Sequence, residues 1–234
     1  EIRLHLAGGF RPGSIYELVY ETEGPPVQGL GFAAVRDLIA ILKYGPDDRL
    51  FFHGSGRSPL EIDYAYGFGV SQSGRLLRNF LHLGFNVDES GRKVFDGLIP
   101  HVAGAGLGFF NFRFAQPNRH NGQHEDHLFT ADRFPFTYGT SYNPFSGKVD
   151  AIQARTAAKN PALLPKVMHT QSAAEYWHRA GSLVHTDPLG RLDATVPENV
   201  RVYTFGGTQH GPAGWPPKFS GAQNLRNPGD YKPF

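Results

Sequence analysis

The chain has 234 residues, a net charge of +2 and no cysteine. This length suits one domain with a substantial apolar interior, and the absence of cysteine excludes disulfides and thiol chemistry. The basic residues are scattered and no apolar segment is long enough to span a bilayer, so the composition predicts neither a nucleic-acid partner nor a membrane-bound protein. We therefore expect its partner to be a small molecule.

Two short strands are predicted near the amino terminus, at residues 2 to 6 and 14 to 21, with turn-forming glycine and proline between them. The chain starts at Glu1, and its only methionine is Met168. We therefore expect a piece of a longer protein, with residues 1 to 234 as one domain at its carboxyl-terminal end. The cellular compartment stays undecided.

An amphipathic helix is predicted at residues 32 to 43, ended by Gly45. Its apolar face is expected to pack on a sheet and to consist of Phe32, Val35, Leu38, Ile39 and Leu42. Residues 46 to 61 are polar and rich in turn formers, which predicts a surface loop.

The most informative segment is a strand at residues 62 to 70 that runs into Gly-Val-Ser-Gln-Ser-Gly-Arg at residues 69 to 75. In a nucleophile elbow, a serine occupies a sharp strand-to-helix turn, and the residues two before and two after it must be small. Here Gly69 precedes Ser71, and Ser73 stands where glycine is common. We predict Ser71 as a nucleophile and the backbone amide of Gln72 as an oxyanion donor. The alternative is a glycine-rich turn that only caps a helix.

The helix after this turn is predicted through Leu76, Leu77, Phe80 and Leu81 and ends at Gly84. Further elements follow in alternation: a strand at 94 to 103, a strand at 166 to 170, a helix through residues 176 to 184 and a strand at 199 to 205. This alternation predicts an α/β fold with a mostly parallel sheet covered on both faces. Residues 104 to 165 show no regular pattern and are rich in aromatic residues, which predicts an inserted lid or an apolar pocket wall.

A base and an acid can be sought after the last strands. His210 lies in a glycine-rich loop after the strand at 199 to 205, where its imidazole could take a proton from Ser71. In this architecture the acid comes between serine and histidine in the chain, so Glu175, Asp187 and Asp193 all qualify. Glu175 is the first choice, although the sequence Ser-Ala-Ala-Glu at 172 to 175 is also a helix capping box.

Together, the motif at 69 to 75, the helix at 29 to 37, the segments at 175 to 177 and 185 to 188, and Gly-Thr-Gln-His-Gly at 207 to 211 resemble the α/β-hydrolase superfamily. More narrowly, they are similar to bacterial proteins described only as alpha/beta hydrolase domain proteins. The resemblance implies an α/β-hydrolase fold and a serine hydrolase with Ser71, His210 and Glu175 as its triad. It implies no substrate. Gly8 and Gly9 are the candidates for a second oxyanion donor.

A second cluster of reactive side chains lies in the aromatic segment, where His120, His124, Asp126 and His127 are all chemically suitable metal ligands. Their spacing fits no specific zinc motif, and hydrogen bonding within a polar loop is the alternative.

The main prediction from the sequence is a serine esterase without a cofactor that acts on a small-molecule ester. A metal-dependent hydrolase and a noncatalytic ligand-binding module are the alternatives.

Overall fold

The computed structural model describes residues 3–14, 16, 21, 23–24, 29–45, 62–108, 110 and 132–211. In chain order its elements are α1 (Gly31–Tyr44), β1 (Tyr66–Val70), α2 (Gln72–His82), β2 (Gly97–His101), β3 (Ser141–Asn143), β4 (Lys148–Asp150), α3 (Ala154–Lys159), the 3-10 helix η1 (Pro161–Leu163), β5 (Lys166–Ser172), α4 (Ala173–His178), the 3-10 helix η2 (Gly181–Val184) and β6 (Val200–Phe205).

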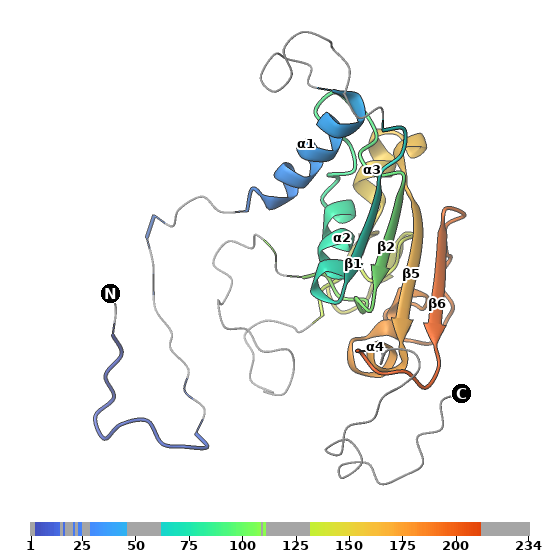
Figure 1. Ribbon diagram of the computed structural model, residues 1–234. Helices are drawn as coiled ribbons and strands as arrows, with labels where there is room; N and C mark the ends of the chain where they lie inside the picture. The colour runs from blue at the N-terminus through green and yellow to red at the C-terminus, as the bar shows by residue number, and fades with distance from the viewer. Residues whose placement is uncertain are drawn as a thin grey trace, which may run out of the picture.

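Four strands form a parallel sheet in the order β1, β2, β5, β6 (Figure 1). Leu98 of β2 lies opposite Gly67 of β1 and Val167 of β5, and Val167 lies opposite Val200 of β6. The prediction of a mostly parallel sheet in an α/β fold is confirmed. Because all four strands run in one direction, the loops that follow them leave from the same edge of the sheet.

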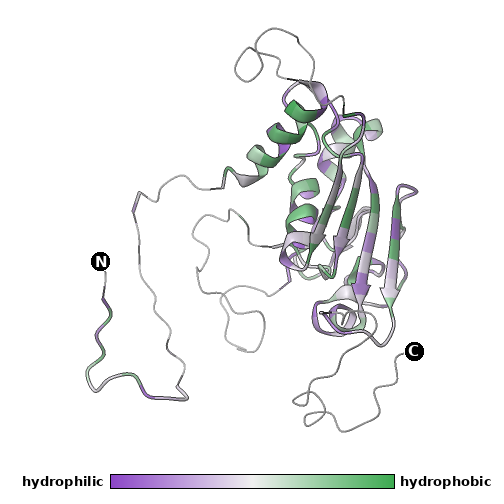
Figure 2. Cartoon of the chain, in the orientation of Figure 1, coloured by the Kyte–Doolittle hydropathy of each residue, from purple (hydrophilic) through white to green (hydrophobic). Residues whose placement is uncertain are grey.

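The hydrophobic core lies between the sheet and α2, which packs on β1 and β2. Phe80 and Leu81 of α2 are completely buried. In the strands, Leu98 and Val200 are at most 1% exposed. Figure 2 shows apolar residues in α1, in α2 and in the strands of the sheet. Removing a side chain of this size from water stabilises the fold by roughly 1.5–3 kcal/mol.

Helix α1 ends where the sequence predicts, at Gly45, whose φ of 77° is available to glycine at little cost. Phe32 is buried and its ring stacks on that of Phe85 at 5.5 Å. Leu38, which was expected on the buried face, is instead 57% exposed. Successive helix residues are turned by about 100°, so Leu38 lies well round from Ile39 and at the margin of the apolar stripe.

The other face of the sheet is more open at β1. The rings of Tyr66 and Phe68 alternate with Gly67 and Gly69 along this strand and are 72% and 65% exposed. The described helices therefore cover β1 on the α2 side only, and helical cover of its second face stays a prediction.

The single helix predicted through residues 176 to 184 is wrong, because the structure divides it. Helix α4 ends at His178, Ala180 has a left-handed φ of 52°, and η2 starts at Gly181. The chain turns back so tightly that a Cβ at Gly181 would lie 2.7 Å from the carbonyl oxygen of Glu175. As a result Trp177, counted among the apolar positions of the predicted helix, is 78% exposed.

The segment at 104 to 165 is more regular than its sequence indicates. Residues 132–165 contain the β3–β4 hairpin, α3 and η1. Phe136, Tyr138 and Ile152 are buried in the hydrophobic core, so this part of the segment belongs to the core of the domain. Its short elements carry too few residues to show a period. The prediction of a lid now concerns residues 111–131, which lie outside the described residues.

The predicted strand at residues 2 to 6 is not formed at residues 3 to 6, where Leu4 and Leu6 are largely exposed. An alternation of apolar side chains makes a strand only when another strand pairs with it, and the described residues provide none here. Most of the second predicted strand, at 14 to 21, and the loop at 46 to 61 lie outside the described residues.

Candidate active site

Ser71 occupies the turn between β1 and α2, as the motif predicts. Its φ and ψ are 56° and −115°, a conformation that a residue with a side chain adopts only when its surroundings impose it. The turn is fixed on both sides: the amide of Ser71 donates to the carbonyl of His101 at 2.8 Å, and the amide of Arg75 donates to the carbonyl of Ser71 at 3.0 Å. The strain therefore sits on the residue expected to react.

Glycine is required at two positions of this turn. A Cβ at Gly69 would lie 2.5 Å from the carbonyl oxygen of Ser73, and a Cβ at Gly74 would lie 2.9 Å from the carbonyls of Gly69 and His101. Ser73 itself is exposed. Serine is tolerated there because its side chain points away from the crowded side of the turn, while Gly74 takes the close contact.

Gln72 is the first residue of α2, and the amides of the first helical turn have no partner within the helix. Its amide is thus available next to Ser71, where the motif expects an oxyanion donor. Gly8 and Gly9 are not brought to this place. They belong to an exposed turn in which Gly9 donates to the carbonyl of Leu6 at 2.9 Å, and neither lines the pocket around Ser71.

Glu175 makes both contacts that the sequence left as alternatives, one within the capping box and one with His210. One carboxylate oxygen, Oε2, closes the capping box of α4 by accepting from the amide of Ser172 at 3.2 Å and from the Ser172 hydroxyl. The other, Oε1, contacts Nδ1 of His210. Glu175 is only 1% exposed. Burial alone would raise the pKa of Glu175, but the hydrogen bonds from Ser172 and His210 outweigh it and hold the pKa below its ordinary value.

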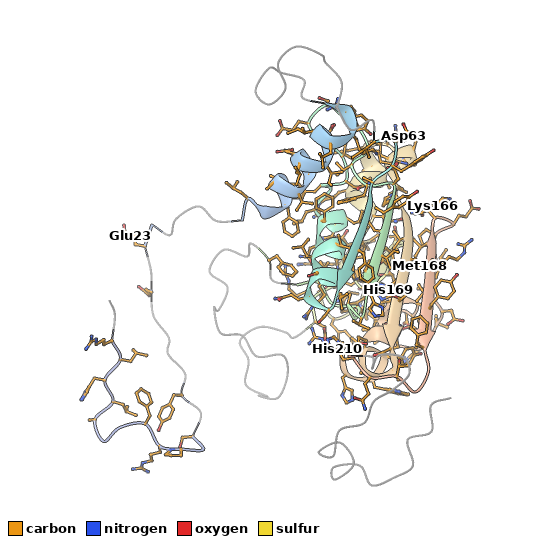
Figure 3. The ribbon with its side chains drawn as sticks, in the orientation of Figure 1. Glu23, Asp63, Lys166, Met168, His169 and His210 are labelled. Carbon is orange, nitrogen blue, oxygen red and sulfur yellow. The ribbon has the colours of Figure 1, made fainter. Side chains whose placement is uncertain are left out.

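His210 lies in the loop after β6, at the end of the sheet where α4 begins (Figure 3). An ionised carboxylate can only accept hydrogen bonds, so Nδ1 of His210 carries the hydrogen and donates it in the bond to Glu175. The neutral imidazole then has a lone pair on Nε2. The side chain of His210 is 53% exposed, whereas that of Glu175 is 2% exposed. A buried carboxylate therefore holds a more accessible imidazole.

These groups share one pocket of about 240 Å³. Its lining residues are Ser71, Arg75, Val102, Ala103, Ala174, Glu175, His178, Arg179 and His210. The two other candidate acids lie elsewhere: Asp187 accepts from the amides of Arg191 and Leu192 in its own loop, and Asp193 pairs with Thr186 in an isolated β-bridge. Of the three carboxylates, Glu175 is the one brought to His210.

Three features of the pocket were not found from the sequence. Arg75 follows Ser71 by four residues on α2, a spacing that places both on the same side of the helix and could have identified it. Arg179 directly follows the end of α4. It was missed because the sequence predicted one continuous helix across this position. Val102 has a positive φ of 46°, fixed by a 2.8 Å hydrogen bond from its amide to the carbonyl of Thr170. No local sequence pattern predicts a positive φ for a β-branched residue.

The sequence also offers possible metal ligands in the histidine-rich segment at residues 120 to 127. His120, His124, Asp126 and His127 lie outside the described residues, and among the described residues no three histidine or acidic side chains are grouped to hold a metal ion. None of the described helices has the length and apolar character needed to cross a membrane.

Comparison with curated proteins and with solved structures found no significant match. A family model described as "Alpha/beta hydrolase domain" matches residues 9–231. The match spans the elbow, the loop of His210 and all the strands of the parallel sheet. The chain therefore belongs to the alpha/beta hydrolase domain family and has a hydrolase fold.

Proposed function

We propose that this protein is a serine hydrolase that cleaves a carboxylic ester or a related acyl compound through an acyl-enzyme on Ser71. The observation that carries the proposal is the contact between Nδ1 of His210 and the buried carboxylate of Glu175, in the pocket that Ser71 also lines. The strained backbone of Ser71 and the unpaired first amides of α2 support the same conclusion.

In the first half of the reaction, the Ser71 hydroxyl attacks the acyl carbon of the ester while Nε2 of His210 takes its proton. The electron pair of the carbonyl moves to its oxygen, and the amide of Gln72 donates a hydrogen bond to the negative charge that forms there. When the tetrahedral species collapses, the bond to the alkoxy group breaks and His210 returns the proton to the leaving alcohol. Glu175 stays ionised and stabilises the transient imidazolium.

In the second half, a water molecule attacks the acyl carbon of the ester on Ser71 and gives a proton to Nε2 of His210. When the second tetrahedral species collapses, the bond between the acyl carbon and Oγ of Ser71 breaks, Oγ takes the proton back from Nε2 of His210, and the carboxylic acid is released. Each step uses the same three side chains and the same oxyanion donor, so loss of any one of them should slow both halves.

A fluorophosphonate probe tests the proposal directly, because it labels only serines that a neighbouring base activates. We expect label on Ser71, found by peptide mass, and its loss in Ser71→Ala and in His210→Ala. Ser73→Ala is the matched control, since Ser73 is an exposed serine two residues away and its variant should still be labelled. A folded protein whose Ser71 resists the probe would instead be a noncatalytic ligand-binding module.

A further inference from the structure

The walls of the pocket carry more positive charge than the triad requires. Arg75 and Arg179 both line it, together with Ser71 and His210. Arg179 pairs with Asp132, whose Oδ1 lies 3.8 Å from Nη2 of Arg179, beyond hydrogen-bonding distance. Glu175, the acid that lines the pocket, is already engaged by His210 and Ser172.

The guanidinium of Arg75 has no hydrogen bond or ion pair with any described residue, although it is partly buried. A buried cation is costly unless an anion or hydrogen-bond acceptors compensate it. Burial, and next the like charge of Arg179, lower the pKa of Arg75, whereas the charge of Asp132 raises it. The two arginines therefore lie close enough to repel each other, and among the described residues Asp132 is the carboxylate whose charge acts on both.

We propose that Arg75 and Arg179 bind a carboxylate of the substrate, so that the preferred substrate is an ester that also carries a free carboxylate, such as the monoester of a small dicarboxylic acid. This inference rests on the proposed function for the ester and adds the class of substrate. Guanidinium groups match carboxylates because their planar forks donate two parallel hydrogen bonds. The spacing of four residues on α2 keeps Arg75 beside the reacting Ser71.

The size of the pocket agrees with a small substrate. Its volume of about 240 Å³ lies below the roughly 300–1,000 Å³ that is usual for sites of drug-sized ligands. Apart from Ser71, the charged groups and the histidines, the described lining consists of the small side chains Val102, Ala103 and Ala174. A short acyl chain can lie along these residues with its carboxylate at the arginines.

The first test compares two p-nitrophenyl esters that differ in charge, the hemi-ester of glutaric acid and its neutral methyl ester. The wild-type protein should have a higher kcat/KM for the hemi-ester than for the methyl ester. Arg75→Gln or Arg179→Gln should reduce the ratio of these two kcat/KM values about tenfold or more. Arg75→Lys, which keeps the charge but loses the fork, should fall between. Arg191→Gln, a change at an exposed arginine outside the pocket, should keep the ratio. A ratio that both glutamine variants leave unchanged would overturn the inference.

The second test needs no reaction and separates this inference from the proposed function. Binding of glutarate to the Ser71→Ala protein is followed by ligand-detected NMR and compared with binding to Ser71→Ala carrying Arg75→Gln or Arg179→Gln. We expect binding that weakens about tenfold or more in each double variant, and weaker binding of inorganic phosphate at the same ionic strength. Absence of binding, or equal binding of phosphate, contradicts a carboxylate site whether or not Ser71 reacts with a phosphonate.

Discussion

The backbone of Gly69 lies against the carbonyl of Ser73, so closely that a Cβ on residue 69 would be 2.5 Å from that oxygen. The oxygen belongs to the first turn of α2, which cannot move without moving Ser71. The sharpness of the nucleophile turn therefore depends on a missing side chain at residue 69.

Gly69→Ala should consequently disrupt the turn. Because the new methyl group meets backbone, relief requires a shift of the start of α2, and we expect a loss of stability of about 1–3 kcal/mol together with a large loss of phosphonate labelling. Urea unfolding and labelling rates would measure both effects. Ser73→Gly is the control, since residue 73 is exposed and should keep most of the labelling rate. An alanine variant with wild-type stability would show that the contact relaxes freely.

The two contacts of Glu175, with Ser172 and with His210, can be separated by mutation. Ser172→Ala removes the hydroxyl that contacts Oε2 and should reduce stability by about 0.5–2 kcal/mol, as other helix-cap deletions do, while leaving the contact to His210. Glu175→Gln should affect both properties and should lower kcat by roughly 100- to 10,000-fold, because His210 loses its ionised support. Thermal unfolding and steady-state kinetics on an activated ester measure the two effects. Equal losses of kcat in the two variants would contradict the assignment of Glu175 as the acid.

Stability should decrease on mild acidification because of His169 on β5. His169 is completely buried, and its Nδ1 lies 3.0 Å from the Tyr138 hydroxyl. Burial and then the charge of Arg78 hold its pKa well below the ordinary value, against the weaker effect of Gln171. The unfolded chain protonates this residue below about pH 6.5 and the folded chain does not, so the contribution is complete above that pH and is lost below it at up to about 1.4 kcal/mol per pH unit.

The free energy of unfolding in urea, measured at about pH 7 and about pH 5.5, tests this expectation for His169. The wild type should lose roughly 1 kcal/mol more than His169→Gln over this interval. His178→Gln, a change at an exposed histidine, should keep the pH dependence of the wild type. If His169→Gln showed the same loss as the wild type, His169 would have to take up its proton in the folded state.

Chelators distinguish the serine mechanism from a metal-dependent one. Hydrolysis by Ser71, His210 and Glu175 requires no metal ion, so exhaustive dialysis against EDTA should leave both ester hydrolysis and labelling of Ser71 within about twofold of their starting values. Metal-dependent hydrolysis at the cluster of residues 120 to 127 would be lost and would return with zinc. The protein in which His120, His124 and His127 are all alanine provides the control that involves no chelator.

The sequence predicted those parts of the fold and site that follow from local patterns. The strand, turn and helix around Ser71 carry their own signature, and the parallel sheet follows from the alternation of strands and helices. The place of Glu175 was predicted from chain order, but its simultaneous capping and His210 contacts depend on how the end of β5 faces the loop after β6. Arg179 and Val102 were missed because their positions arise from left-handed turns that tertiary packing imposes. The buried side chains at 136 to 152 were missed because their elements are too short to be periodic.

The order of the strands across the sheet is also their order along the chain, from β1 to β6. During synthesis the sheet can therefore grow by adding each new strand to one edge, without inserting any strand between two that are already paired. Ser71 and its elbow emerge first, Glu175 follows with α4, and His210 arrives only after β6 has left the ribosome. Under the proposed function, a nascent chain thus holds a nucleophile without its base, and Ser71 becomes reactive only when the last described strand is in place.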